Sequence, residues 1–374
     1  MLRLATAYLV VPHDTTDTIE YARRLVEVLQ RDPRVTRAHV GPLDRDWSPQ
    51  YTAYPPMDED TSHSTVLDAT RHMHGQLFSE PVAIELRVPA KNQPKVFEYD
   101  EIPSERYLAL WDGQCLLVAW EQPAADGVGS SGGHVIEEIL EEAVDAIDAG
   151  LFVQACNPRC RYVFLHTAIR ATIDRNATAD WSMSHRSGDP YNLELVLSAG
   201  DSLPEVALTA WWRLRGSLRK FATMKNRGRQ ILELESLVRS DLDHLNRLHH
   251  ERASASQRRF PARLGVLWTH RSWRRVSRFY LARLWLGLGS LERLRRQWSD
   301  EATSFRRTAD EHNLQDLFTV DTYDEVALVE KLDLHLVEAA VEHAEGRLSS
   351  NLLALATVGG GVAGAVVAAI LTAA

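Results

Sequence analysis

The spacing of hydrophobic and polar residues predicts a mixed α/β region over roughly the first 205 positions. Its clearest signal is two alternating apolar runs, 106–111 and 114–121, which flank the pair Asp112-Gly113. Because Asp-Gly tolerates the positive φ angles of a type I′ turn, this pattern predicts a β-hairpin. By the same criteria we expect further strands over 3–12, 34–42, 82–89, 94–100, 160–169 and 192–198, and helices over 15–31, 61–78 and 135–149.

From position 206 the strand signals cease, and helical spacing predicts three long helices. We expect them over 206–254, over 269–312, and from 323 into the C-terminal segment, with breaks near Phe260-Pro261 and Phe318-Thr319. Apolar residues in the second helix recur every seven positions, and such a seam seeks a helical partner. The seam consists of Leu284, Leu291, Trp298 and Phe305, with Leu281 and Leu288 beside them.

A Gly/Ser-rich stretch at 124–133 has neither hydrophobic periodicity nor bulk, so it predicts a linker and a domain boundary. The fold class we expect is α+β: an N-terminal α/β sensor-like domain, a long-helix bundle or stalk, and one C-terminal transmembrane helix. The expected parts are an α/β domain at 1–123, the linker at 124–133, a second α+β segment at 134–205, a basic helical bundle at 206–320, a stalk helix at 321–350 and a transmembrane helix at 351–374.

The last segment of the sequence is the most specific feature. No charged residue occurs in 348–374, and 352–374 is apolar apart from Thr357 and Thr372. A helix that crosses the hydrocarbon core needs about 20 residues, so this segment is long enough. With Arg347 just before it, the positive-inside rule predicts a tail-anchored, single-pass protein of the inner (cytoplasmic) membrane with its bulk in the cytoplasm. The alternative is a buried Gly/Ala hairpin or helix in a soluble oligomer, because Gly359-Gly360-Gly361 could break the helix.

Small residues recur every four positions within this apolar segment, which would leave one helical face nearly bare of side chains. In lipid such a face lets helix backbones approach, so the pattern predicts a glycine zipper and a homo-oligomer. The residues concerned are Ala356, Gly360, Gly364, Ala368 and Thr372.

The formal net charge of −9 averages two opposite regions. Residues 206–307 hold 23 Lys and Arg against 8 Asp and Glu, a net of +15, together with six of the ten tryptophans. This module could pack on the acidic remainder of the chain, lie on anionic lipid or contact nucleic acid. Of these three partners, nucleic acid is the one we do not expect. The basic surface we expect comprises Arg271, Arg274, Arg275 and Arg278.

Motifs for catalysis are weak. Only three cysteines occur, and the pair Cys156 and Cys160 lacks a second Cys/His pair at zinc spacing, so we expect no metal, no cofactor and no enzyme activity. Arg239 and His244 fit the Arg-x4-His pattern of helical ribonucleases, which leaves a membrane-tethered ribonuclease as an alternative.

The order of parts resembles the CorA-like magnesium transporter superfamily. At residue level the resemblance rests on the hairpin from Tyr107 to Trp120 and on Ser349-Ser350-Asn351 before the apolar segment. It implies a cation channel or transporter whose pore is lined by Asn351, Thr357 and Gly361. The Gly-Met-Asn loop of that family and a second span are absent from this sequence.

The function we expect is therefore that of a non-enzymatic membrane protein, of the type of a bacterial stress or conflict effector. Its cytoplasmic α+β region would regulate self-assembly of the glycine-zipper span, and assembly would permeabilise or gate the membrane. The expected partners are membrane lipid, further copies of the chain, and a regulatory protein that contacts the N-terminal domain.

Overall fold

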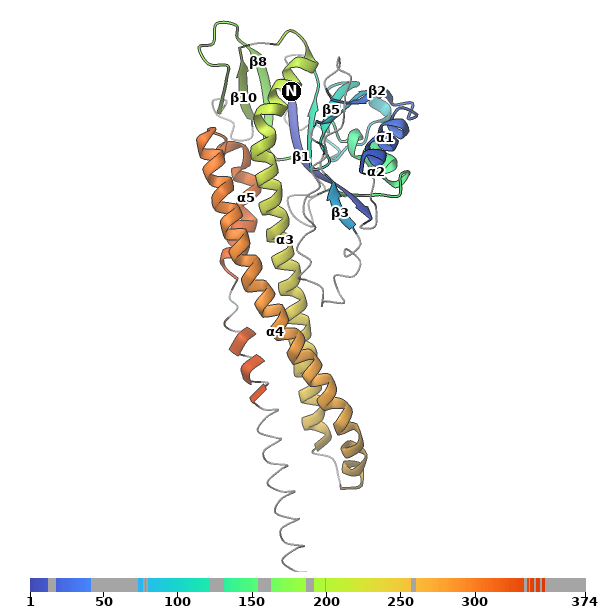
Figure 1. The fold of residues 1–374 in the computed structure, drawn as a ribbon, viewed down its shortest axis with the longest axis vertical. Coiled ribbons are helices and arrows are strands. Elements are labelled where there is room, and N and C mark those ends of the chain that lie inside the picture. Colours follow the sequence, from blue (N-terminus) through green and yellow to red (C-terminus); the bar gives the residue numbers. More distant parts are fainter. Residues whose placement is uncertain are drawn as a thin grey trace, which may run out of the picture. The chain divides into compact units, whose positions relative to one another are not determined.

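The structure is a computed structural model in which most of the chain is described (Figure 1). The described residues are 1–12, 18–41, 73–76, 78, 80–121, 131–153, 163–185, 192–198, 200–256, 260–332, 335, 337–339, 341–343 and 345–346. They form two compact units. The first contains Met1–Asn226 and Asp300–Asp324, and the second contains Arg227–Ser299 and Glu325–Ala374.

The first unit is an α+β structure, as the alternating and helical patterns predict. Its strands are β1 (Leu2–Pro12), β2 (Val35–Val40), β3 (Met73–Gln76), β4 (Val82–Arg87), β5 (Arg106–Trp111), β6 (Cys115–Ala119), β7 (Gly150–Val153), β8 (Ala168–Ile173), β9 (Trp181–His185) and β10 (Asn192–Leu197). Its short helices are α1 (Thr18–Leu29), the 3₁₀ turn η2 (Ala90–Asn92) and α2 (Val135–Asp145). Three further helices, α3 (Leu203–Ser256), α4 (Phe260–Glu311) and α5 (Gln315–Glu330), contribute residues to both units.

The sheet has the strand order β2-β4-β5-β6-β1-β8-β10-β9, with β3 and β7 also paired to β1. Strand β1 lies next to β6 and β8 over its first residues and next to β7 and β3 over the remainder. Strands β8 and β10 form a parallel pair, and the other pairs are antiparallel. The sheet thus joins strands that lie on both sides of residues 124–133.

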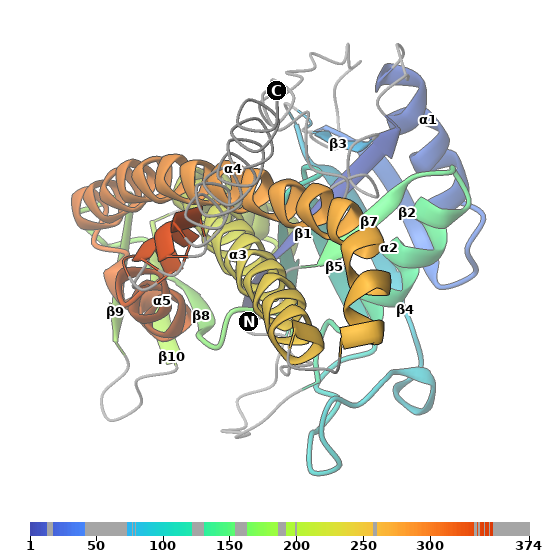
Figure 2. The ribbon, with the colours of Figure 1, turned by 90° about the horizontal axis from the view of Figure 1, so that it is seen from below.

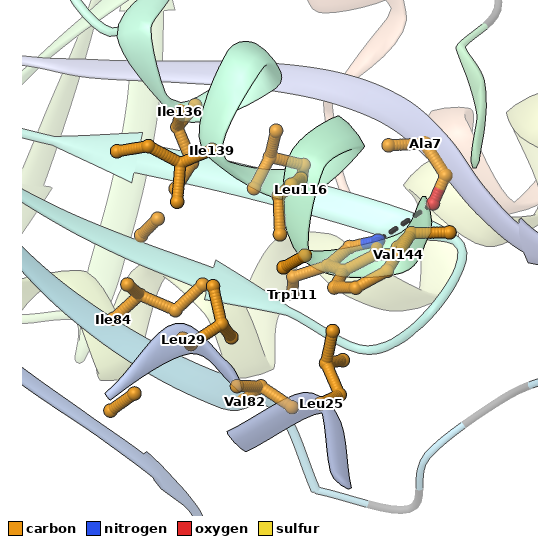
Figure 3. Packing of buried hydrophobic residues seen from close by; sticks show 14 of the residues in the cluster. Ala7, Leu25, Leu29, Val82, Ile84, Trp111, Leu116, Ile136, Ile139 and Val144 are labelled. Carbon is orange, nitrogen blue, oxygen red and sulfur yellow. Dashed lines mark hydrogen bonds between the residues drawn. The ribbon is translucent and has the colours of Figure 1, made fainter. Parts of the chain in front are cut away.

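Helices α1 and α2 lie side by side and pack on the sheet (Figure 2). Apolar residues of α2 recur at the spacing that puts them on one face, and that face is buried. Figure 3 shows Trp111 at the centre of this core, with its indole Nε1 donating a 2.6 Å hydrogen bond to the Ala7 carbonyl oxygen. The labelled residues around it are Leu25 and Leu29 of α1, Ile136, Ile139 and Val144 of α2, and Val82, Ile84 and Leu116 of the sheet.

The seven-residue seam of the second long helix is buried, as predicted. Five of its members lie on α4 in the second unit, and each is at most 8% exposed: Leu281, Leu284, Leu288, Leu291 and Trp298. There α4 packs on α3 (Figure 1), and Arg283 pairs with Asp241 at 3.0 Å across the two helices. The last member, Phe305, is buried in the first unit, where its ring contacts those of Phe221 and Phe318.

Several of the expected elements differ from the structure. The strand expected at 160–169 is displaced, since β8 begins at Ala168, and the stalk helix expected at 321–350 is interrupted, since α5 ends at Glu330. The segment 94–100 is not a strand, since after η2 it forms turns held by Asp100. Within the predicted helix 61–78, the described residues 73–76 form strand β3. The break expected at Phe318-Thr319 lies instead at 312–314, where Asn313 takes a φ of 54°, and α5 continues through both residues.

The hairpin at Asp112-Gly113 is confirmed, but its turn is not of type I′. A type I′ turn needs positive φ at both central residues. Here the backbone N–H of Asp112 donates to the Cys115 carbonyl oxygen, so Gly113 and Gln114 are the two central residues of the turn. Gly113 has a φ of 86°, but the φ of Gln114 is not positive. The Asp112 carboxylate instead accepts the backbone N–H groups of Gln114 and Cys115 at 3.0 and 2.7 Å.

The predicted domain division also differs from the structure. Residues 134–205 share one sheet and one compact unit with 1–121, so a boundary at 124–133 does not separate them. Residues 124–130 lie outside the described part of the chain, as does the predicted transmembrane helix at 351–374. Among the described residues, no helix has the length and apolar character required to cross a membrane.

Two glycines of α4 provide a test of the helix packing in the second unit. A Cβ on Gly287 would lie 2.6 Å from Val238 Cγ2, whereas a Cβ on Gly289 would have no neighbour within 4 Å. We therefore expect Gly287→Ala to lower the free energy of unfolding by about 1–3 kcal/mol through overpacking. We expect Gly289→Ala to raise it by about 0.5–1 kcal/mol, because alanine is the better helix former. Urea denaturation of the two variants measures both, and equal effects would contradict this packing.

Candidate functional site

The residues predicted for the membrane segment lie outside the described part of the chain. These are the zipper residues Ala356, Gly360, Gly364, Ala368 and Thr372 and the pore residues Asn351, Thr357 and Gly361. Of the predicted basic surface, Arg275 and Arg278 are exposed on α4. Arg271 and Arg274 lie on the same helix, and their side chains are outside what the structure describes.

The ribonuclease pair of the sequence is not brought together as a site. Arg239 hydrogen-bonds with Glu235 one turn earlier on α3. The His244 ring stacks on Tyr280 of α4, with 5.8 Å between the ring centroids. Each side chain therefore has a structural partner, and no observation in the described structure favours phosphate chemistry at this place.

A buried ion pair joins the turn of the β5–β6 hairpin to α3. Asp112 is completely buried, and its Oδ2 lies 2.5 Å from Nη2 of Arg219. Burial raises the pKa of Asp112, while the Arg219 guanidinium and the hydrogen bonds from Cys115 and Gln114 oppose that rise. The nearby Cys115 thiol is also fully buried, and burial raises its pKa far above the ordinary value, so it is not a reactive thiolate.

A second polar cluster joins the strand region before β8 to α3 and α5. His166 Nδ1 lies 2.8 Å from Asp321 Oδ1, and the backbone N–H of His166 donates to Asp321 Oδ2 at 3.1 Å. Lys225, only 3% exposed, donates from Nζ to the Asp321 carbonyl oxygen at 2.8 Å. The hydrogen bond to Asp321 raises the pKa of His166, with burial acting in the opposite direction.

The first unit also contains a pocket of about 250 Å³ between β9, α3 and the end of α4. None of the described residues that line it is acidic, and two are arginines. The lining residues are Trp181, Trp212, Arg213, Arg215, Gly216, Ser217, Thr308 and His312.

Cations and rings are held close together at this pocket. The Arg215 guanidinium carbon lies 3.6 Å from the centre of the Trp212 ring, in cation–π geometry. Burial and the neighbouring charge of Arg219 lower the pKa of Arg215. Lys220 Nζ donates to the Thr308 hydroxyl at 2.5 Å, which brings a further cation to one of the lining residues.

Two small residues of α3 complete the pocket wall. The hydroxyl oxygen of Ser217 is buried, and it has no hydrogen-bond partner among the described residues. A Cβ on Gly216 would meet nothing within 4 Å, so the helix backbone faces open space there. Glycine inside a helix costs about 1 kcal/mol relative to alanine, and a common reason for it is close approach of another molecule to the backbone.

No sequence motif predicts this pocket, because its residues come from positions 181, 212–217 and 308–312. A charge count of 206–307 finds the arginines but not their common location. Among the described residues, no group of three or more His, Cys, Asp or Glu side chains is placed to hold a metal ion.

Comparison of the chain with protein-family models, with curated proteins and with solved structures finds no match.

The His166–Asp321 pair makes stability depend on pH. Because the pKa of His166 is raised in the folded state, its contribution is fully present below the ordinary histidine pKa near 6.5 and is lost as pH rises through the folded value. We expect His166→Gln to destabilise the protein more at pH 5.5 than at pH 8.5, as measured by urea denaturation. In an Asp321→Asn background this difference between the two pH values should disappear. A His166→Gln effect that is the same at both pH values would contradict the assignment.

Proposed function

We propose that this is a non-enzymatic membrane protein whose α+β unit regulates self-association of the apolar segment 352–374. Assembly of several such segments would permeabilise or gate the inner (cytoplasmic) membrane. The observation that carries the proposal is the sequence of this segment, which has no charged residue and two threonines as its only polar side chains. Burial of that much apolar surface in hydrocarbon is favourable, and its length matches the hydrocarbon thickness.

The small-residue pattern supports association over a passive anchor. An anchor requires only apolar bulk, whereas glycine and alanine every fourth residue reduce hydrophobicity and expose the helix backbone. In lipid the gain comes from close packing with an equivalent face, so the partner we propose is a second copy of the chain. Lipid is the other partner, and Arg347 before the segment favours a cytoplasmic location for the folded units.

The described structure is compatible with a regulatory role of the first unit. Helices α3, α4 and α5 each begin or end in that unit and continue into the second. Within the first unit, α3 is tied to the sheet by the Asp112–Arg219 pair and by Tyr8, whose hydroxyl donates to the Ala222 carbonyl oxygen at 2.7 Å. A change in the sheet is thus linked by direct contacts to the start of the long helices. Exposed Arg275 and Arg278 on α4 would add attraction to anionic lipid.

Deletion of 352–374 tests membrane association. We expect the full-length protein to sediment with membranes and to resist carbonate extraction, because the segment would lie in hydrocarbon. The truncated protein should remain in the supernatant with its fold unchanged by circular dichroism. Full-length protein that stays dispersed without detergent and does not bind liposomes would contradict the proposal.

Substitution along the segment separates association from insertion. Gly360→Leu and Gly364→Leu add bulk to the proposed zipper face, so we expect crosslinked oligomers and dye release from liposomes to fall about tenfold while membrane binding persists. Val362→Leu and Val366→Leu are the matched controls, because in a helix these positions lie on the opposite face. Equal loss in all four variants, or no loss in the glycine variants, would exclude a zipper.

A further inference from the structure

We propose that the pocket lined by Trp212, Arg213 and Arg215 binds a nucleoside monophosphate. This inference concerns the first unit alone and does not depend on insertion of the apolar segment. It rests on four features of the pocket: the sign of its charge, its aromatic rings, its unsatisfied hydroxyl and the bare backbone at Gly216.

The charge selects an anion. Arg213 and Arg215 line the pocket, and Lys220 contacts the Thr308 hydroxyl. The lining contains no acidic residue among those described, although the charges of Asp112 and Glu80 act on Arg215 from outside the lining. Asp180 does approach Arg213, but the two atoms are 3.5 Å apart and the Asp180 side chain is 86% exposed, so this pair is weak and a ligand can replace it. A phosphate group suits such a site, since it accepts two parallel hydrogen bonds from a guanidinium and can carry two negative charges.

The rings select a planar group on the same ligand. Trp181 and Trp212 both line the pocket, and Trp212 is 43% exposed, so part of its ring is accessible to a ligand. Arg215 covers one face of the Trp212 ring, which fixes the guanidinium plane beside the indole. A nucleobase stacks on indole or guanidinium surfaces of this kind with little dependence on its identity.

The remaining wall provides room and one more hydrogen bond. The Ser217 hydroxyl is buried with no hydrogen-bond partner in the described part of the chain, and a buried unpaired hydroxyl costs about 1–3 kcal/mol unless a ligand or water completes it. Gly216 lets a ligand approach the α3 backbone. The pocket volume of about 250 Å³ lies just below the usual range of about 300–1,000 Å³ for small-molecule sites. It therefore favours a mononucleotide over a dinucleotide.

Titration calorimetry of the full-length protein in detergent with AMP, GMP, CMP and UMP tests the proposal directly. We expect at least one of them to bind, with an affinity that falls as salt is added because phosphate is held by charge. Inorganic phosphate, ribose 5-phosphate and the free nucleoside should each bind at least tenfold more weakly than that nucleotide. Binding of none of the four at millimolar concentration would overturn the inference, and so would phosphate binding as tight as nucleotide binding.

Substitution of Gly216 locates the site. Gly216→Leu should fill the pocket and weaken nucleotide binding at least tenfold without lowering Tm, because nothing lies within 4 Å of the added Cβ. Gly289→Leu is the matched control, since Gly289 also lies within a long helix with open space at its Cβ, and it should bind as the unmodified protein does. Undiminished binding by Gly216→Leu would place the nucleotide elsewhere and overturn the assignment.

Substitution of the ring and the guanidinium separates the two recognition elements. Arg215→Gln removes a charge-assisted contact, so we expect a loss of about 10–100-fold in nucleotide affinity. Trp212→Leu should weaken the nucleotide at least tenfold more than it weakens ribose 5-phosphate, because the base loses its stacking surface while Arg213 and Arg215 still carry the charge that holds the phosphate. Trp285→Leu is its control, because Trp285 is 38% exposed on α4 in the second unit and should not affect binding. A Trp212→Leu variant that binds nucleotide normally would exclude stacking.

Discussion

Strand β1 is the element on which the first unit depends, because both of its edges are used along nearly its whole length. Residues Leu2 to Thr6 pair with β6, and the following residues pair with β7 on one side and β3 on the other. The N–H groups of Ala7 and Leu9 donate to the carbonyl oxygens of Gln114 and Gly113, so the hairpin turn is also aligned by β1. A slip of one residue would reverse the faces of its buried side chains, which makes this register strongly specified. In the described sheet β1 lies between β6 and β8 and joins them, so the sheet is continuous across the Gly/Ser stretch in sequence.

Buried charge then determines how α3 lies on the sheet of the first unit. Arg219 and Lys225 both lie on α3, and each meets a polar group that is itself buried: the Asp112 carboxylate and the Asp321 carbonyl oxygen. Loss of one member of such a pair leaves an uncompensated charge at a cost of about 3–5 kcal/mol, so rotation or sliding of α3 is strongly disfavoured. Part of the positive charge of 206–307 therefore has an intramolecular role, as one of the three interpretations of the charge pattern expects. Farther along, Arg275 and Arg278 are exposed on α4.

Signals that lie within a few residues of each other predicted structure well, and signals that depend on distant partners did not. The Asp-Gly hairpin and the seven-residue seam on α4 both follow from local spacing, and both are present. The segment 94–100 looks like a strand by composition, yet the Gln93 side chain donates to the carbonyl oxygens of Val88 and Ser104 and holds the chain as a loop. Phe318 looks like a helix end, but it is buried against Phe221 and Phe305, and tertiary packing keeps the helix intact. The pocket could not be predicted, since Trp181 and Thr308 meet α3 only in the folded chain.

The position of the pocket gives a physical reason why a ligand there would affect the helices. One wall is α3, two residues before the Arg219 ion pair, and the other contains Thr308 and His312, immediately before the break at Asn313 that separates α4 from α5. Helix α5 carries Asp321, which binds His166 and Lys225. A ligand that bridges these walls stabilises their present arrangement, by about 2.7 kcal/mol at a concentration 100 times its Kd. It shifts an equilibrium only if the competing state binds it less well, as would a state in which Thr308 and His312 are displaced from α3. Binding of the proposed ligand would therefore be coupled to α5 through the residues next to the break at 312–314, and α5 leads in sequence to the apolar segment.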